Sequence, residues 1–249
     1  MEIIEYKLLF DAEKVGFWPV VRREILREKI LKYQKNNVNK KIIDIGCGPG
    51  GNILLLKDFG RVTGLDMSAE ALKFAKTNNF DELTQASATN IPFGNESFDM
   101  ATSFDVLEHI EDDEAVIREV MRILKPGGMF VVTVPAYPVL WSQHDVSMHH
   151  VRRYLKRDLL SKLKKAGFEI EYHTYFIMLA VPIRVLQILR DKLLKNKLTK
   201  EKTSYKVEYS GLSNSILLFL LRIEKVILRF SKVPFGTSIL VIARKNMID

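Results

Sequence analysis

A glycine-rich loop at residues 42–51, IIDIGCGPGG, is the segment best suited to bind a nucleotide-like ligand. It follows a short β-branched run and leads into a helical pattern, which predicts a strand, a loop and a helix in succession. Gly46 and Gly48 would let the backbone turn tightly and approach a ligand at the carboxyl end of the strand. Because the spacing fits both D-x-G-x-G-x-G and G-x-G-x-x-G, the loop alone leaves two cofactor classes open.

Two aspartates lie near this loop, and one of them, Asp44, narrows the choice of ligand. Asp66 ends the next predicted strand, about twenty residues beyond Gly46, where an acid can accept hydrogen bonds from ribose hydroxyls of either cofactor class. A carboxylate at Asp44 suits the ammonium of a methionine moiety and would repel a pyrophosphate. A purely structural role for Asp44, in which it caps nearby backbone N–H groups, is the alternative. Asp44 therefore favours a methionine-containing ligand over a dinucleotide, whereas Asp66 is compatible with both.

The densest cluster of other reactive side chains is residues 135–154, PAYPVLWSQHDVSMHHVRRY. His144 or His149 could act as a general base oriented by a carboxylate, and the two arginines could hold a phosphate or carboxylate. The aromatic residues would form an apolar wall. The candidate catalytic residues of this stretch are His144, Asp145, His149, Arg152, Arg153 and Tyr154.

Metal binding is the rival interpretation of these histidines. The spacings from His144 to His149 and to His150 do not stack on one helix face, and the sequence contains no HExxH, so we expect no metal site. A solvated loop whose histidines hydrogen-bond locally is a third interpretation. Glu108 and His109, in DVLEHI, follow another predicted strand and either face the substrate or only shape its pocket.

Strands alternate with helices over most of the chain. This alternation predicts an α/β fold, with a parallel sheet covered on both faces and right-handed crossovers. We expect strands at 41–45, 61–65, 98–104, 129–134, 168–176 and 238–243, and helices at 52–59, 69–77, 112–124 and 155–166.

The chain divides into three predicted parts: an N-terminal helical lid at 1–40, a core at 41–176 plus 237–249, and a helical insertion at 177–236. The insertion is too long for a hairpin loop. It joins apolar helical segments to a basic run at 190–206.

The second half of this insertion carries Arg222, Lys225 and Arg229 on one helix face. A basic amphipathic helix is typical of a membrane-surface element that meets anionic headgroups. A lid over the site or a homodimer interface is the alternative. Nucleic acid is not expected as a partner, because aromatic residues are not interleaved with the bases.

Four motifs in order, IIDIGCGPGGN, TGLDMS, NIPFGNESFDMATSFDVLEHI and ILKPGGMFVVTVP, resemble those of class I methyltransferases that use S-adenosylmethionine. The resemblance covers residues 41–170 and is closest to the type-11 family, which includes ubiquinone-pathway enzymes. It implies a Rossmann-like sheet of about seven strands whose last strand is reversed. It also implies that Gly46 and Gly48 line the methionine portion, that Asp66 holds the ribose and that Met67 flanks the adenine.

Two further features complete the expected cofactor site. Where the family usually has an acid before the IPF segment, this chain has Ala86-Ser87-Ala88, so Ser87 or a backbone group would contact the adenine amine. Trp18 and Arg22 resemble a segment that folds over the cofactor, with Arg22 on the methionine carboxylate. A surface arginine beside a core tryptophan is the alternative. The expected cofactor-binding residues are Trp18, Arg22, Asp44, Gly46, Cys47, Gly48, Asp66, Met67, Ser87, Ala88 and Phe104.

Composition fits this interpretation. The 249 residues carry a net charge of +8, which favours anionic partners, and one cysteine, Cys47, which allows neither an internal disulfide nor a cysteine zinc cluster. The N-terminal residues lack the pattern of a signal peptide. We therefore expect a cytoplasmic protein, with attachment to the inner face of the membrane as a further expectation.

The sequence favours methyl transfer to an O, N or C atom of a small hydrophobic or anionic, lipid-like substrate. A soluble small-molecule acceptor and a non-catalytic cofactor-binding adaptor are the alternatives.

Overall fold

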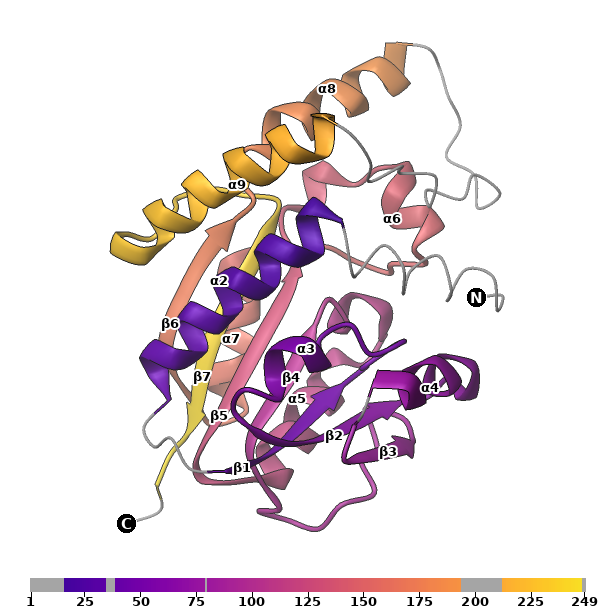
Figure 1. The fold of residues 1–249 in the computed structure, drawn as a ribbon, viewed down its shortest axis with the longest axis vertical. Helices are drawn as coiled ribbons and strands as arrows, with labels where there is room; N and C mark the ends of the chain where they lie inside the picture. Colours follow the sequence, from indigo (N-terminus) through magenta and orange to yellow (C-terminus); the bar gives the residue numbers. More distant parts are fainter. Residues whose placement is uncertain (1–15, 35–38, 79, 194–211, 248–249) are drawn as a thin grey trace.

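A seven-stranded sheet forms the centre of the protein (Figure 1). The computed structural model describes residues 16–247 apart from 35–38, 79 and 194–211. The strand order is β3-β2-β1-β4-β5-β7-β6, and β7 runs antiparallel to both of its neighbours. The predicted α/β class and reversed last strand are confirmed. The strands are β1 (Lys40–Ile45), β2 (Gly60–Asp66), β3 (Glu82–Gln85), β4 (Phe98–Phe104), β5 (Leu124–Pro135), β6 (Phe168–Phe176) and β7 (Ser238–Lys245).

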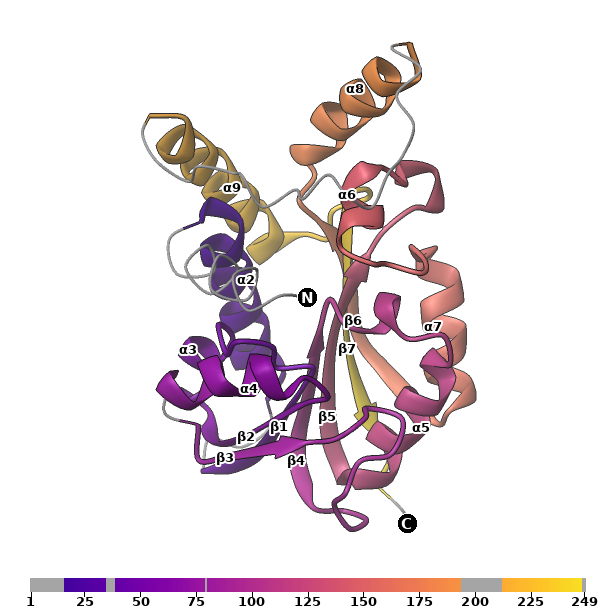
Figure 2. The same ribbon diagram turned by 90° about the vertical axis from the view of Figure 1, so that its right-hand side faces the viewer.

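Helices and short 3-10 turns fill the connections between the strands, as the alternating pattern predicted. Figure 2 shows helices on both faces of the sheet, with α8 and α9 at one end of it. The helices are α2 (Phe17–Tyr33), α3 (Ile53–Leu56), α4 (Ala69–Ala75), α5 (Asp113–Ile123), α6 (Gln143–Ser147), α7 (Lys156–Lys165), α8 (Ala180–Leu193) and α9 (Leu212–Phe230), and the 3-10 turns are η1 (Lys76–Asn78), η2 (Leu107–His109) and η3 (Pro138–Leu140).

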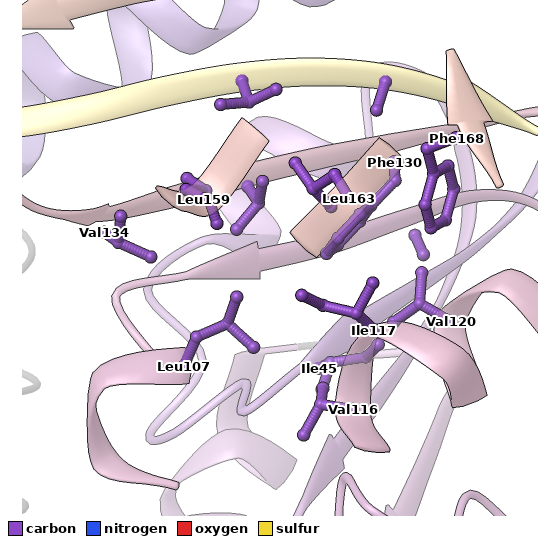
Figure 3. Packing of buried hydrophobic residues seen from close by; sticks show 14 of the residues in the cluster. Ile45, Leu107, Val116, Ile117, Val120, Phe130, Val134, Leu159, Leu163 and Phe168 are labelled. Carbon is purple, nitrogen blue, oxygen red and sulfur yellow. The ribbon is translucent and has the colours of Figure 1, made fainter. Parts of the chain in front are cut away.

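Each face of the sheet builds its own apolar core, because successive strand residues point to opposite faces. Ile43 of β1 packs under α5 and α7, whereas the adjacent Ile42 belongs to the core under α2, α3 and α9. Figure 3 shows the first of these cores, in which Phe130 of β5 lies beside Leu163 of α7. The two cores fix the sheet and therefore the edge at which its parallel strands end.

The N-terminal helix α2 packs against α9, and charged side chains join the two helices. Glu24 accepts hydrogen bonds from Arg222 at 2.9 Å and from Lys225 at 2.6 Å, and Arg229 donates to Glu28 at 2.5 Å. The sequence assigned these three bases to a membrane-facing stripe. In the structure they pair with Glu24 and Glu28 of α2, and contact with a membrane stays a prediction.

A buried glutamate of α9 anchors this helix to the end of the sheet. Glu224 is 1% exposed, and its carboxylate accepts the backbone N–H of Met178, just beyond β6, at 2.9 Å. Both helices of the segment predicted as an insertion therefore meet the carboxyl edge of the sheet: α8 begins shortly after β6, and α9 is bonded to the residues between them. The division of the chain into three parts stays a prediction, and residues 1–15 and most of the basic run at 190–206 lie outside the described residues.

Candidate active site

The glycine-rich loop after β1 holds a conformation that other residues would not adopt. Gly46 and Gly48 have φ angles of +69° and +54°, in the left-handed region. A Cβ at Gly46 would lie 2.5 Å from Cγ2 of Val106, so glycine is also required for space. The N–H of Gly46 donates to the carbonyl of Leu65 at 2.7 Å. The loop is thus held between the ends of β1, β2 and β4.

Asp66 connects this loop to the end of β2. Its carboxylate accepts the N–H of Gly48 at 2.9 Å and the N–H of Ser68 at 2.8 Å. Burial raises the pKa of Asp66, and the two backbone N–H groups offset part of that rise. Asp66 lies beside the loop, where a ribose contact would require it, and that contact stays a prediction.

Asp44 belongs to β1, two residues before Gly46 of the loop, and pairs with Thr102 of β4. It is 1% exposed, and Thr102 of β4 donates its hydroxyl to Asp44 at 2.7 Å. Three other residues expected at the cofactor are also buried in this region: Cys47, Ala88 and Phe104. Ala88 and Phe104 belong to different apolar cores, and contact of the three residues with the cofactor stays a prediction.

The expected adenine side is more open. Met67 is 75% exposed, and its backbone carbonyl accepts a hydrogen bond from the side chain of Gln85 at 3.2 Å. Ser87 is exposed, but its hydroxyl is engaged by the hydroxyl of Thr89 at 2.8 Å and by the N–H of Thr89 at 3.2 Å. Ser87 would have to leave this local turn, or share it, to contact an adenine amine.

The N-terminal helix α2 brings Arg22 to the loop. Its guanidinium donates to Asp105, at the end of β4, at 2.5 Å and to the side chain of Asn52, at the start of α3, at 3.0 Å. Trp18, one turn earlier, lies with its ring 5.5 Å from the ring of Phe176. Arg22 is therefore in the region predicted for it, although Asp105 already shares its charge.

Asp145 is the centre of the polar cluster after β5. This fully buried carboxylate accepts from Arg153 at 2.7 Å, from Nδ1 of His150 at 2.9 Å and from the N–H of Ser142 at 2.9 Å. Arg153 also donates to the carbonyl of Ala136 at 3.0 Å. Burial alone would raise the pKa of Asp145, but His150 and Arg153 outweigh it and hold that pKa well below its usual range.

The two histidines predicted as bases differ in their surroundings. His144, in α6, is half-buried, and burial together with Arg184 of α8 lowers its pKa to about 4. His144 is consequently neutral at pH 7, and it is a weaker base than an ordinary imidazole. His149 is exposed, and its φ of +57° is uncommon for a residue with a Cβ. The role of either histidine stays a prediction.

Arg152 and Tyr154 meet at a different carboxylate. The Tyr154 hydroxyl donates to Asp113, at the start of α5, at 2.7 Å, and Arg152 lies 3.1 Å from the same carboxylate. Lys162 of α7 donates to Asp113 as well, at 2.6 Å. The residues predicted as one catalytic set are therefore divided: Arg153 pairs with Asp145, whereas Arg152 and Tyr154 meet at Asp113.

A third group was not selected from the sequence as a site. Glu108 is fully buried, and its carboxylate lies near the side chains of His109 and His150, with one ligand atom of each within 4.8 Å of the others. Burial and the nearby Asp105 raise the pKa of Glu108 well above its usual value. The only sequence signal for this group is DVLEHI, because His150 reaches it from a distant segment.

The buried pair of Asp145 and Arg153 predicts a pH-dependent effect on stability. Because folding lowers the pKa of Asp145 below its unfolded value of about 3.9, the pair stabilises the fold above that pH. This stabilisation is lost as the pH falls through the lower, folded pKa. We expect Asp145→Asn to reduce the free energy of unfolding by about 3–5 kcal/mol at pH 7, and by less at pH values below about 4.

Urea unfolding at pH 7 and at pH 3 measures this difference. Asp158→Asn is the matched control, because Asp158 is exposed and its ion pair is with the exposed Arg157. Its effect should stay within about 0.5 kcal/mol. An equal loss of stability at both pH values in Asp145→Asn would show that the ion pair does not contribute.

Residues 43–132 match the family of the methyltransferase domain. An uncharacterized protein of Methanocaldococcus jannaschii is 37% identical over 148 residues, which cover 57% of this chain and 55% of that protein. The ubiquinone biosynthesis O-methyltransferase of Pseudomonas fluorescens is 30% identical over 173 residues, covering 63% of this chain and 72% of that enzyme. For the first two curated relatives, the match spans little more than half of their length, 55% and 53%.

The fold also matches solved structures. A chain from a Haloferax volcanii complex that contains the Trm112 methyltransferase activator aligns with a TM-score of 0.65 and 18% identity, over 100% of this chain and 97% of that chain. This likeness concerns the fold. The matched domain, the identity to a named methyltransferase and the glycine loop held by Asp66 agree with one another. The chain belongs to the S-adenosylmethionine-dependent methyltransferases, whose cofactor is S-adenosylmethionine.

Proposed function

We propose that this protein transfers a methyl group from S-adenosylmethionine to an oxygen of a hydrophobic, lipid-like small molecule at a membrane surface. The observation that carries the substrate class is the exposed apolar surface of α8 and α9. Both helices stand at the end of the sheet where the glycine loop and the Asp145 cluster lie (Figures 1 and 2). Oxygen is favoured as the acceptor atom because the Pseudomonas fluorescens relative is named an O-methyltransferase.

The exposed apolar residues of α8 and α9 are large and numerous, and we call them the apolar rim. Contiguous exposed side chains of this kind mark a surface that meets a membrane, a ligand or another protein. None of the helices in the described part of the chain is long and apolar enough to cross a bilayer. The apolar rim consists of Ile183, Val185, Leu186, Leu189 and Leu193 of α8 and Phe219, Leu220, Ile223, Val226, Ile227 and Phe230 of α9.

A membrane surface is the occupant that best fits the apolar rim. Burial of these side chains in the acyl boundary would supply the affinity, since each large apolar residue contributes about 1.5–3 kcal/mol when fully buried. The net charge of +8 would add attraction to anionic headgroups. Arg222, Lys225 and Arg229 contribute less to it than the sequence suggested, because glutamates of α2 partly neutralise them.

The chemical step is an in-line displacement on the methyl group. The acceptor oxygen forms a bond to the methyl carbon, the sulfur–carbon bond breaks, and the sulfur keeps the electron pair as S-adenosylhomocysteine forms. The acceptor proton passes to a base, for which His144 and His149 are the candidates. Most of the rate would come from holding the two reactants in line, which the rigid loop and the buried Asp145 cluster support.

A methyl-transfer assay tests this function. Labelled S-adenosylmethionine is incubated with the protein and a lipid extract, or with a water-soluble metabolite extract, and the label is then partitioned. We expect label in the lipid fraction. His144→Gln or His149→Gln should lower turnover by about 100-fold or more without changing cofactor affinity.

The control for these variants is His173→Gln, because His173 lies on the edge strand β6 among lysines. Label only in water-soluble products would contradict a lipid acceptor. Unchanged turnover in both histidine variants would reject the assignment of the base. Failure to label any acceptor would favour a non-catalytic adaptor.

Vesicle binding tests the apolar rim separately. We expect the protein to sediment with phosphatidylglycerol vesicles, and binding should weaken as salt screens its charge. The double variant Phe219→Asp/Ile223→Asp should lower the vesicle affinity about tenfold or more, because two apolar residues are replaced by anions.

The matched control is Met247→Asp. Met247 is 73% exposed and follows β7 at the opposite end of the sheet, so this change should leave vesicle affinity unchanged. Equal loss in both variants would indicate a charge effect without a docking face. A wild-type protein that stays in the supernatant at low salt, and behaves as a dimer, would assign the apolar rim to a second copy of the chain.

A further inference from the structure

Glu108, His109 and His150 form a compact group that the proposed reaction does not use. Glu108 and His109 belong to η2, which follows β4, whereas His150 follows α6. One side-chain ligand atom from each of the three lies within 4.8 Å of the other two. The rings of His109 and His150 meet edge to face, with centroids 4.8 Å apart.

The carboxylate of Glu108 lacks the partner that a buried charge requires. The residue has no exposed surface, and neither carboxylate oxygen has a hydrogen-bond partner among the described residues. Burying an ionised carboxylate without a partner is costly. The nearest positive side chains are committed elsewhere, Arg153 to Asp145 and Arg22 to Asp105. A cation bound beside Glu108 would neutralise the buried carboxylate charge.

Both histidines are oriented so that one ring nitrogen stays available. His150 bonds to Asp145 through Nδ1 at 2.9 Å, which leaves its Nε2, and Arg153 fixes Asp145 in turn. His109 bonds to the backbone carbonyl of His149, which leaves its other nitrogen. A histidine held by a carboxylate or a carbonyl through one nitrogen is the usual arrangement of a metal-binding histidine.

We propose that Glu108, His109 and His150 bind one divalent transition-metal ion through a carboxylate oxygen and two imidazole nitrogens. This donor set suits Zn²⁺, Fe²⁺ or Mn²⁺ and favours them over Mg²⁺, which prefers oxygen ligands. Three ligands leave coordination positions open for a water or a substrate oxygen. The exposed side of His109 gives an ion access from solvent.

The sequence predicted no metal site, because the spacing of the histidines within 135–154 does not fit one. Ligands bonded to one ion at about 2.1 Å lie about 3.0–3.5 Å apart, so the three side chains must close by about an ångström. A small shift of the exposed His109 side chain would supply this closure. The ligand set joins two distant segments, which a spacing rule within one segment does not detect.

The location of the site links it to the proposed reaction. Val106, two residues before Glu108, is the residue against which Gly46 of the cofactor loop packs. An ion held by Glu108 would therefore lie near the place where an acceptor meets the methyl donor. Its use there, to hold an acceptor oxygen in its deprotonated form, rests on the proposed function; the binding of the ion does not.

Metal titration of the full chain tests this site without any acceptor. The protein is stripped with a chelator and titrated with Zn²⁺ by calorimetry and with Co²⁺ by visible absorption. We expect one ion per chain for each metal. Glu108→Gln and His150→Gln should each weaken binding about tenfold or more.

Two conservative controls match these changes. Glu111→Gln removes an exposed carboxylate three residues from Glu108, and His173→Gln removes an imidazole on β6. Both should bind Zn²⁺ and Co²⁺ as the wild type does. Binding of S-adenosylhomocysteine shows that a variant is folded. If Glu108→Gln or His150→Gln fails this check, His109→Gln takes its place, because this change is at an exposed side chain.

Absence of stoichiometric Zn²⁺ and Co²⁺ binding by the wild type would overturn the proposal. So would equal affinity in the site variants and the controls. Neither result would bear on methyl transfer, because the labelled-methyl assay is independent of the titration.

Discussion

The hydrogen bonds from Gly48 and Ser68 to the carboxylate of Asp66 are the constraint on which the cofactor site depends. They tie the loop after β1 to the start of α4 through one half-buried side chain at the end of β2. The left-handed backbone at Gly46 and Gly48 makes this closure possible. Because Gly46 also packs directly on Val106, the same loop fixes the segment after β4, which carries Glu108 and His109.

The acceptor side depends on a second buried carboxylate. Asp145 connects the helix α6 to Arg153 and to His150, so one ion pair orders the whole segment between β5 and α7. Buried ion pairs contribute little net stability relative to apolar contacts, yet the loss of one partner is costly. We infer that Asp145 serves to position its neighbours: it orients His150 toward Glu108 and fixes α6, which carries His144, and the turn at His149 that follows.

The sequence predicted the parts of the fold that rest on local pattern. The short strand-like runs of β1, β2 and β4 and the glycine loop correctly indicated the α/β class. The strand β3 was missed, because ELTQ at 82–85 has no apolar alternation and lies at a half-exposed edge. The beginning of β5 was missed as well, because Pro126 and Gly127 are turn signals, although Leu124 pairs with Phe98 across an irregular register.

Contacts between distant segments determine features that the local sequence pattern does not predict. The basic residues of α9 indicated a membrane-facing stripe, and in the folded chain they form ion pairs with Glu24 and Glu28 of α2. The predicted catalytic set is contiguous in sequence, yet Tyr154 faces Asp113 while Arg153 faces Asp145. The group around Glu108 joins segments more than forty residues apart, and only the folded chain brings it together.

The central claim is the identity of the methyl donor, and calorimetry with S-adenosylhomocysteine and with NAD tests it most directly. We expect the protein to bind S-adenosylhomocysteine and not NAD. Asp66→Ala and Gly46→Ala should each weaken this binding about tenfold or more, whereas Asp158→Ala should leave it unchanged. Binding of NAD, or no heat with S-adenosylhomocysteine, would contradict it.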